Sequence, residues 1–320
     1  MKQKNDFEKV AEYLQEPDFN RVLVVCHRSP DGDACGSAHA LAYALRKMGK
    51  QARVFCPDPF GAEFSYLTSA EEGLSFFEPT HFVSVDVAAP DMLCGASFTD
   101  KIEIVIDHHR INGVQGKLRC IMPEMASCGE MVLEIIRLLP VSFDAYLADA
   151  LYTAMATDTG CFRYSNTNAH TFSSVAFLYP FAAEKAFYRI NKALFETKSK
   201  KRMQLEAYAA GEVRYFAQGK GSYLTVSLEK QRELQVGYDE LDPLINVIRQ
   251  IEGVRLSFVA KEREPGVFKV SVRAEEGFDA SDFCHVFGGG GHISAAGCTL
   301  EGEESEILSR LLSEAEERLR

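Results

Sequence analysis

Two hydrophobic patterns alternate along the first part of the chain. Short, continuous apolar runs, typical of strands that are buried on both faces, lie at 21–26, 51–56, 81–88 and 102–107. Apolar residues with helical spacing predict helices over 6–16, 37–50, 127–139, 143–160 and 168–179. Strands that alternate with helices in this way predict an α/β domain, with a mainly parallel sheet flanked by helices.

The second part of the chain has a different pattern. Alternating apolar and polar residues predict half-buried strands over 223–228, 254–262 and 267–275, with a hairpin turn at 264–266. Helical spacing returns at 241–251, 280–287 and 303–319. A charged, helix-compatible stretch separates the two parts. We therefore predict a catalytic domain over 1–185, a helical linker over 186–212 and a smaller α/β domain over 213–320.

Composition narrows the choice of partners. The chain has 320 residues, of which 46% are hydrophobic, and this is enough for two packed cores. A net charge of −11 disfavours the coating of long duplex nucleic acid, although a local site can still bind a small phosphorylated molecule. No apolar run is long enough to span a bilayer and the N-terminal stretch does not resemble a signal peptide, so we expect a cytoplasmic protein without a membrane partner. The nine cysteines show no CxxC pair and are interpreted as free thiols.

Carboxylates and imidazoles follow the predicted strands of the first domain. Because the carboxyl ends of parallel strands meet at one edge of a sheet, side chains at these positions can converge. One further aspartate ends a predicted helix. The candidate metal ligands and their neighbours are His27, Asp31, Asp33, Asp86, Asp107, His108, His109 and Asp158.

This donor set has a definite chemistry. Several carboxylates in one cleft would repel each other, and divalent cations remove that repulsion. Hard oxygen ligands mixed with imidazoles suit Mn²⁺ or Mg²⁺ better than an ion that prefers thiolates. Two such ions can clamp the attacking and leaving oxygens of a phosphoryl transfer and convert water to hydroxide. The pattern therefore predicts metal-dependent hydrolysis of a phosphoester or a phosphoanhydride.

A second motif, FGGGGHISAAG at 287–297, contains the run Gly288, Gly289, Gly290 and Gly291. Glycine permits positive φ and close backbone approach, so exposed amides in such a run can bind an anion. His292 and Arg273 are natural phosphate ligands beside it. An ordinary loop is the alternative interpretation.

Together, these motifs resemble those of a known superfamily. HRSPDGDA at 27–34, Asp86 within VSVDVA, DHH at 107–109 and DTG at 158–160 resemble the successive motifs of the DHH phosphoesterases. The glycine motif resembles that of the DHHA1 substrate-binding domain. Within the superfamily, the chain is similar in length to the stand-alone nanoRNase and pAp phosphatase group.

The resemblance implies how the ligands are shared. It implies two Mn²⁺ ions, with Mg²⁺ as the alternative. The implied ligands are His27 and Asp31 for one ion, Asp33, His108 and Asp158 for the other, and Asp86 as a bridge between them.

It also implies roles for the residues around the ions. Asp107 would orient an imidazole or a loop without binding metal. His109 would face the scissile phosphate and act with Asp86 and His108 in catalysis, with a purely structural role as its alternative. Arg110 would help to hold phosphate, unless it is only a surface charge. The glycine run, His292 and Arg273 would grip the terminal phosphate of the substrate.

The expected function is therefore that of a two-domain phosphoesterase. It would hydrolyse short single-stranded oligonucleotides, or small nucleotides such as pAp, by a two-metal hydroxide mechanism in a cleft between the domains. Hydrolysis of cyclic-di-AMP or pApA is the nearest alternative, and a nucleotide-binding sensor without catalytic activity is a more distant one. The sequence is compatible with a homodimer but does not determine the oligomeric state.

Overall fold

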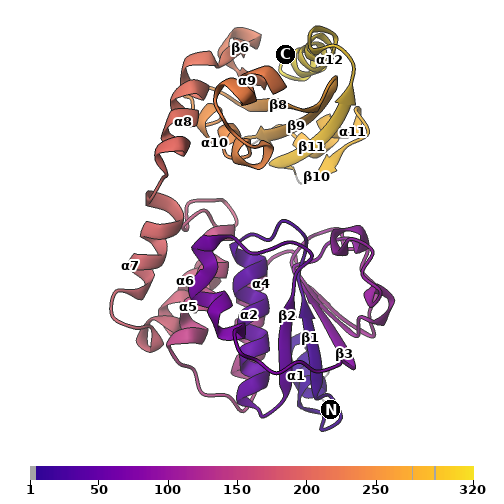
Figure 1. Cartoon of the computed structure of the whole chain (residues 1–320), viewed down its shortest axis with the longest axis vertical. Helices are drawn as coiled ribbons and strands as arrows, with labels where there is room; N and C mark the ends of the chain where they lie inside the picture. The colour runs from indigo at the N-terminus through magenta and orange to yellow at the C-terminus, as the bar shows by residue number, and fades with distance from the viewer. Residues whose placement is uncertain (1–4, 276, 292) are drawn as a thin grey trace. The chain divides into compact units, whose positions relative to one another are not determined.

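The computed structural model of the protein describes residues 5–275, 277–291 and 293–320 (Figure 1). The chain divides into two compact units, Met1–Thr197 (unit 1) and Lys198–Arg320 (unit 2). The division falls within the predicted connector. Its first helix, α7 (Ala186–Asn191), contacts α5 (Ala145–Asp158) in unit 1, whereas α8 (Lys200–Glu212) belongs to unit 2.

Unit 1 contains a five-stranded parallel sheet in the order β2-β1-β3-β4-β5. Its strands are β1 (Arg21–Val25), β2 (Gln51–Phe55), β3 (His81–Val85), β4 (Ile104–Asp107) and β5 (Leu118–Ile121). The first four coincide with the predicted apolar runs. The fifth was not predicted, because it is short and only Cys120 in it is fully buried. The strand order reverses between β1 and β3, and the carboxyl ends of strands beside such a reversal commonly border a ligand site.

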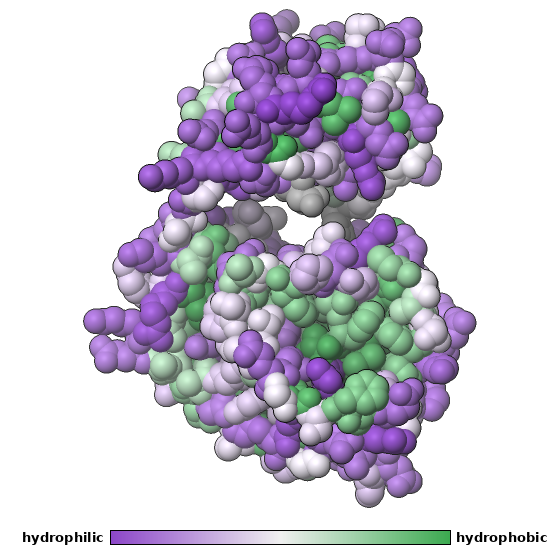
Figure 2. Space-filling view, viewed as in Figure 1, coloured by the Kyte–Doolittle hydropathy of each residue, from purple (hydrophilic) through white to green (hydrophobic). Residues whose placement is uncertain are grey.

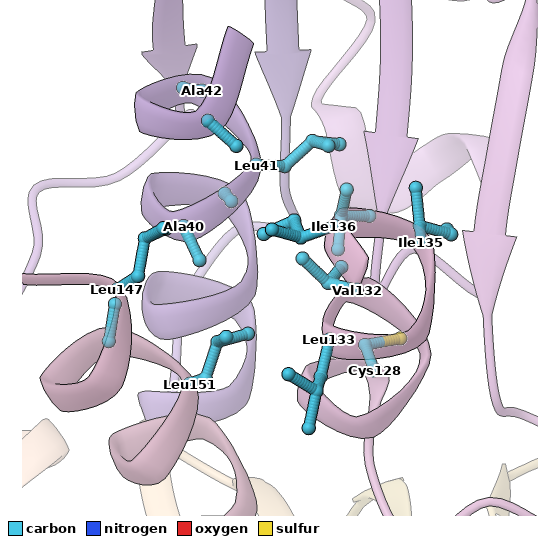
Figure 3. Packing of buried hydrophobic residues seen from close by; sticks show 14 of the residues in the cluster. Ala40, Leu41, Ala42, Cys128, Val132, Leu133, Ile135, Ile136, Leu147 and Leu151 are labelled. Atoms are coloured by element: carbon cyan, nitrogen blue, oxygen red, sulfur yellow. The ribbon is translucent and has the colours of Figure 1, made fainter. Parts of the chain in front are cut away.

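The α-helices of unit 1 lie on one side of this sheet, some of them against the strands and the others against those helices (Figure 1). They are α1 (Asp6–Gln15), α2 (Gly32–Lys47), α3 (Ser65–Thr68), α4 (Cys128–Arg137), α5, α6 (Ala169–Leu178) and α7. Short helical turns join them at Ala62–Phe64, Ser69–Glu71, Tyr179–Phe181 and, as a π-helix, Lys192–Glu196. Figure 3 shows Leu41 of α2, Ile136 of α4 and Leu151 of α5 among the buried side chains that fill this layer.

The start of α2 differs from the prediction. The sequence PDGD favours a turn, and the helix was expected from residue 37. It begins at Gly32 instead, because the Asp31 carboxylate accepts a hydrogen bond from the Ala34 amide (3.0 Å) and so caps the helix. Asp31 and Asp33 therefore lie at the N-terminus of a helix and not in a loop.

The other face of the sheet carries a second apolar cluster. Val25, Phe82 and Val105 pack there against the segment between β3 and β4, which contains short turns of 3₁₀ helix at Pro90–Leu93 and Thr99–Lys101. Figure 2 shows apolar side chains gathered over this part of unit 1. The sheet is thus buried on both faces, which explains why its strands are continuously hydrophobic.

Unit 2 contains a six-stranded mixed sheet in the order β10-β11-β9-β8-β7-β6, in which only the β7–β8 pair is parallel among the described residues. Its strands are β6 (Arg214–Phe216), β7 (Gly221–Val226), β8 (Leu256–Glu264), β9 (Val267–Ala274), β10 (Gly290–Gly291) and β11 (Ala295–Glu301). Its other helices are α9 (Leu228–Glu233), a 3₁₀ turn at Tyr238–Leu241, α10 (Leu244–Ile248), α11 (Ala280–His285) and α12 (Glu304–Arg318).

Helices cover both faces of the second sheet. One core joins the sheet to α11 and α12, and a second joins it to α8 and α10. The strands β6, β10 and β11 were not predicted, because β6 has only three residues, β10 consists of two glycines and β11 begins with Ala-Ala-Gly, which disfavours a strand. Across the described part of the chain, no helix has both the length and the apolar character needed to cross a membrane.

Candidate metal centre

The predicted ligands come together at the carboxyl edge of the unit 1 sheet. His27 follows β1, Asp86 follows β3 and His108 follows β4, so three strands deliver them to one place. Helix ends supply the remaining ligands. Candidate ligand atoms lie within 4.8 Å of one another in four overlapping groups among the described residues. Two of these groups together contain the six predicted ligands: the first is made of His27, Asp31 and Asp86, and the second of Asp33, His108 and Asp158.

The first group is organised by the His27 imidazole. Its Nε2 atom lies 3.4 Å from Asp86 Oδ2 and 3.9 Å from Asp31 Oδ1. Its Nδ1 atom lies 2.7 Å from the Arg28 carbonyl oxygen, and a carbonyl partner requires that Nδ1 carries the proton. Nε2 is then left with its lone pair directed at the carboxylates, which is the arrangement of a metal-binding histidine.

The second group has the same arrangement around His108 as the first has around His27. Its Nε2 atom lies 3.4 Å from Asp158 Oδ2 and 3.9 Å from Asp33 Oδ2, while Nδ1 faces the Met125 carbonyl oxygen at 3.2 Å. His108 Nε2 is also 3.8 Å from Asp86 Oδ1. Asp86 therefore has one oxygen near each group, as a carboxylate shared by two ions would.

The Asp33 carboxylate is fixed by the beginning of α4. It accepts hydrogen bonds from the Cys128 amide (2.7 Å), the Gly129 amide (2.9 Å) and the Ser37 hydroxyl (2.9 Å). The Asp33 side chain is 1% exposed. Amides at a helix N-terminus carry partial positive charge, so α4 stabilises this buried carboxylate before any cation binds.

Asp86 occupies an unusual backbone conformation. Its φ angle is +60°, in the left-handed region that residues other than glycine seldom adopt. Its amide continues the sheet by donating to the Ile106 carbonyl (3.0 Å). Such strain is retained where the surrounding structure requires it, and here it turns the carboxylate between the two groups.

The centre brings several buried carboxylates close together. Burial, together with the charge of nearby carboxylates, raises the pKa of Asp33 and of Asp158 well above the usual range. Burial would also raise the pKa of Asp86, but His27, His108 and His109 together outweigh burial and hold that pKa at about 2. The described ion-pair partners of these carboxylates are imidazoles alone. This excess of negative charge, carried on hard oxygen donors, fits divalent cations.

His109 differs from the other two histidines. Its Nδ1 atom, which lies 3.6 Å from Asp86 Oδ1, is hydrogen-bonded to Asp107 Oδ1 at 2.8 Å. The second Asp107 oxygen accepts from the Asn112 side-chain amide (2.6 Å), and that amide also donates to the Val87 carbonyl (2.8 Å). Asp107 is fully buried and thus orients the His109 ring, while Asn112 orients Asp107. Asn112 was not recognised from the sequence, where only its position shortly after the DHH motif was a signal.

Cys128 was also missed. Its thiol is buried 3.6 Å from Asp86 Oδ1, and its backbone amide binds Asp33. Burial raises the pKa of this thiol well above its usual range, so it is held as a neutral group among the carboxylates. The available signal was the cap sequence SCGE, which marks a helix N-terminus.

Among the predicted phosphate ligands of unit 2, two glycine amides are already used in hydrogen bonds within the fold. The Gly288 and Gly289 amides donate to the His285 carbonyl (3.0 Å) and the Cys284 carbonyl (2.9 Å), so these two amides end α11 and do not face an anion. Gly290 and Gly291 form β10.

Close packing against the backbone of β11 requires a glycine at one position of this run. A Cβ atom on Gly289 would lie 2.2 Å from the Gly297 carbonyl oxygen. Arg273 lies on β9 opposite Ala295 of β11, the strand that pairs with β10, and its guanidinium donates to the Val272 carbonyl. His292 lies outside the described residues. In unit 1, Arg110 is exposed beside the metal centre.

Comparison with known proteins agrees with this geometry. Residues 21–155 match the DHH family, N-terminal domain, and residues 220–320 match the DHHA1 domain. A protein of Thermus thermophilus named bifunctional oligoribonuclease and PAP phosphatase NrnA is 30% identical over 318 residues, covering 97% of this chain and 93% of the relative.

Solved structures show the same fold. An exopolyphosphatase-related protein from Bacteroides fragilis has a TM-score of 0.87 at 22% identity, covering 98% of this chain and 97% of that one. The exonuclease RecJ bound to manganese has a TM-score of 0.52 at 14% identity, covering 99% of this chain and 95% of that one. The order of the motifs, the convergent carboxylates and imidazoles, and a relative that is similar over almost its whole length lead to one conclusion: the chain belongs to the DHH family of phosphoesterases, with a DHHA1 domain after the DHH domain.

Proposed function

We propose that this protein is a phosphoesterase that requires two divalent cations, Mn²⁺ or Mg²⁺, and hydrolyses short single-stranded oligonucleotides and bisphosphorylated nucleotides such as pAp. The observation that carries the proposal is the pair of ligand groups joined by Asp86, in which His27 and His108 direct Nε2 at the carboxylates. The name of the Thermus thermophilus relative, which covers both substrate classes, supports the choice of substrate.

The ligand assignment follows the two groups. The residues that would hold the cations are His27 and Asp31 for one, Asp33, His108 and Asp158 for the other, and Asp86 for both. When bound, the cations would activate a water molecule and offset the negative charge on the phosphate. The protein contributes fixed donor positions, since both imidazoles are oriented by backbone carbonyls and Asp33 by the N-terminus of α4.

His109 is proposed to handle the proton of the leaving group. Asp107 accepts from Nδ1 and so sets the ring orientation, which leaves Nε2 directed away from that hydrogen bond. From there Nε2 can donate a proton to the leaving oxygen of the substrate. Arg110, exposed beside this ring, would add positive charge near the phosphate.

In unit 2, Arg273, His292 and the last two glycines of the run, Gly290 and Gly291, are proposed to bind the terminal phosphate of the substrate, because the amides of the first two glycines already donate to carbonyls of α11. The guanidinium provides paired donors for phosphate oxygens, and the glycines allow the substrate to approach the backbone closely. A site that requires a terminal phosphate would favour short substrates processed from one end.

A panel of five substrates tests the proposal. Purified protein with Mn²⁺ is incubated with a short oligoribonucleotide, pApA, pAp, cyclic-di-AMP and pyrophosphate, and the products are separated by chromatography. We expect turnover of the oligoribonucleotide and of pAp. Turnover of cyclic-di-AMP or pApA alone would establish the alternative substrate class, and binding without turnover of any member would indicate a sensor.

A matched pair of variants links the activity to the centre. Asp86→Asn should lower kcat by at least about a thousandfold, because it removes the carboxylate that both groups share. Asp100→Asn, an exposed aspartate of unit 1, should leave kcat unchanged. Full activity of the first variant, with its fold intact by circular dichroism, would refute the assignment of Asp86.

A further inference from the structure

A pocket of about 480 Å³ opens beside the metal centre and is formed by residues of unit 1 alone. The loop before α2, the turn at Ala62–Phe64, the end of α5 and the π-helix Lys192–Glu196 surround it. Asp31 lines the pocket and also belongs to the first ligand group. Thr157, directly before Asp158, lines it as well. Asp31 therefore belongs both to the pocket and to the proposed site of phosphate hydrolysis, so the two adjoin at this residue.

One side of the pocket, where α2 meets α5, is closely packed. A Cβ atom on Gly32 would lie 2.3 Å from Thr157 Cγ2, so the first residues of α2 rest directly on the end of α5. Only glycine permits this contact without a shift of one helix. A group bound in the pocket is thus held at a fixed position relative to Asp31 and Asp158.

Apolar side chains form much of the remaining surface. Phe64 is buried, and Leu194 and Phe195 of the π-helix are partly buried against the core of unit 1. π-Helical turns are rare and occur frequently at functional sites. Aromatic and aliphatic side chains fixed in this way provide a surface on which a flat ring can stack.

The charges in the pocket decide what kind of ring group fits. Asp31 and Glu63 are its charged side chains among the described lining residues, and both are acidic. Glu63, which is not among the proposed cation ligands, would repel a phosphate, whereas a neutral ring that donates hydrogen bonds to a carboxylate would be attracted. Adenine, guanine and cytosine each have an exocyclic amino group that can donate in this way. Uracil has none, and it carries an acceptor oxygen where adenine and cytosine carry the amino group.

We propose that this pocket binds the base of the nucleotide whose phosphate is hydrolysed, and that Glu63 makes it prefer bases with an exocyclic amino group. The inference rests on the proposed function and adds a determinant of base specificity to it. Phe195 supports the base by stacking, and Glu63 accepts a hydrogen bond from its amino group.

The first test compares two substrates that differ only in the base. The full chain with Mn²⁺ is assayed on a short phosphorylated oligonucleotide that carries adenine at the cleaved position, and on the same oligonucleotide with that base replaced by hydrogen. Phe195→Ala should lower kcat/KM about tenfold on the adenine substrate and less than about twofold on the abasic one. Phe172→Ala, an exposed phenylalanine of α6 outside the pocket, should change neither.

The second test uses an exposed residue, so that a folding defect cannot explain the result. A Glu63→Gln side chain can donate to uracil as well as accept from its ring N–H, and we expect the preference for adenine over uracil to fall about fivefold or more. An unchanged preference, together with equal effects of Phe195→Ala on the adenine and abasic substrates, would overturn the base pocket. Absence of hydrolysis by the unmodified protein would instead refute the proposed function. Calorimetric titration with AMP and UMP would then test the proposed base pocket through binding alone. Equal affinities for the two nucleotides would overturn the proposal.

Discussion

At the scale of single residues, the centre is preorganised by hydrogen bonds to atoms that carry no charge. Backbone carbonyls fix the ring orientation of His27 and His108, and backbone amides fix the Asp33 carboxylate. These partners define where each donor atom points without competing for a cation. Asp107 serves His109 in the same way, although it is itself a carboxylate that the adjacent Asn112 holds in place.

Replacing Asp107 with asparagine should separate catalysis from metal binding. The amide would still fill the buried site but would disturb the hydrogen bonds with His109 and Asn112. We expect kcat to fall about a hundredfold while the bound Mn²⁺, measured by mass spectrometry of the metal, stays unchanged. A parallel loss of metal would show that Asp107 acts on the ions and not on His109. Asp100→Asn is the matched control.

Asp149 on α5 is expected to reduce stability at neutral pH. Its Oδ1 atom is buried without a hydrogen-bond partner among the described residues, and burial raises the pKa of Asp149 to about 6, against the opposing charge of Arg189. A carboxyl whose pKa is higher in the folded than in the unfolded protein destabilises the fold when it is ionised. The loss begins above its ordinary pKa of 3.8 and is complete above about pH 6.

Asp149→Asn should therefore raise the melting temperature by about 2–4 °C at pH 8 and have little effect near pH 4. Thermal unfolding followed by circular dichroism at the two pH values measures the difference. Asp100→Asn, which changes the charge at an exposed position, should show no such pH dependence. A lower melting temperature at pH 8 would mean that the Asp149 carboxylate has a stabilising partner when ionised.

At the scale of elements, the ends of three helices meet the ends of three strands. The N-termini of α2 and α4 supply partial positive charge where Asp31 and Asp33 lie, and this favours ionised carboxylates. The C-terminus of α5 brings Asp158. The positions of the ligands thus depend on the spacing between helices.

Two glycine substitutions should show this dependence. A Cβ atom on Gly36 of α2 would lie 2.3 Å from the Ala150 carbonyl oxygen of α5, so Gly36→Ala would push the two helices apart. We expect a loss of about 1–3 kcal/mol in the unfolding free energy of unit 1 and weaker Mn²⁺ binding. Gly211 of α8 has open space around its Cβ position, and Gly211→Ala should stabilise unit 2 by about 0.5–1 kcal/mol. Urea unfolding measures both, and equal effects would contradict the packing argument.

At the scale of the whole molecule, the chain consists of two units with separate cores. Unit 1 holds the candidate metal centre and the proposed base pocket, and unit 2 holds the glycine motif. Residues 197–199 between them are exposed and lie outside any helix or strand. Such a segment is a preferred site for proteases.

Brief digestion with trypsin should therefore cut first at Lys198 or at the basic residues that begin α8. We expect two fragments, each of which retains its secondary structure, because no described core cluster is shared between the units. Mass spectrometry identifies the cleavage site, and circular dichroism of the separated fragments reports their folding. Early cleavage within a sheet, or unfolding of either fragment, would contradict the division at this position.

Much of the fold followed from local patterns. The strands at 21–26, 51–56, 81–88 and 102–107 were predictable because burial on both faces leaves continuous apolar runs, and the long helices because their apolar residues recur with helical spacing. The start of α2 was not, since PDGD has the composition of a turn and becomes helical through the cap at Asp31. The strand β10 consists of two glycines and exists only because β11 pairs with it.

The sequence by itself determined which side chains could bind cations, because carboxylates and imidazoles stood at the ends of predicted parallel strands and such ends share an edge. It also indicated the family, through the order of the motifs. Only the tertiary structure decided how each ligand is oriented, that Cys128 and Asn112 belong to the site, and that a pocket with acidic and apolar walls adjoins it. These features arise from contacts between residues far apart in the chain, and local hydrophobic pattern carries no information about such contacts.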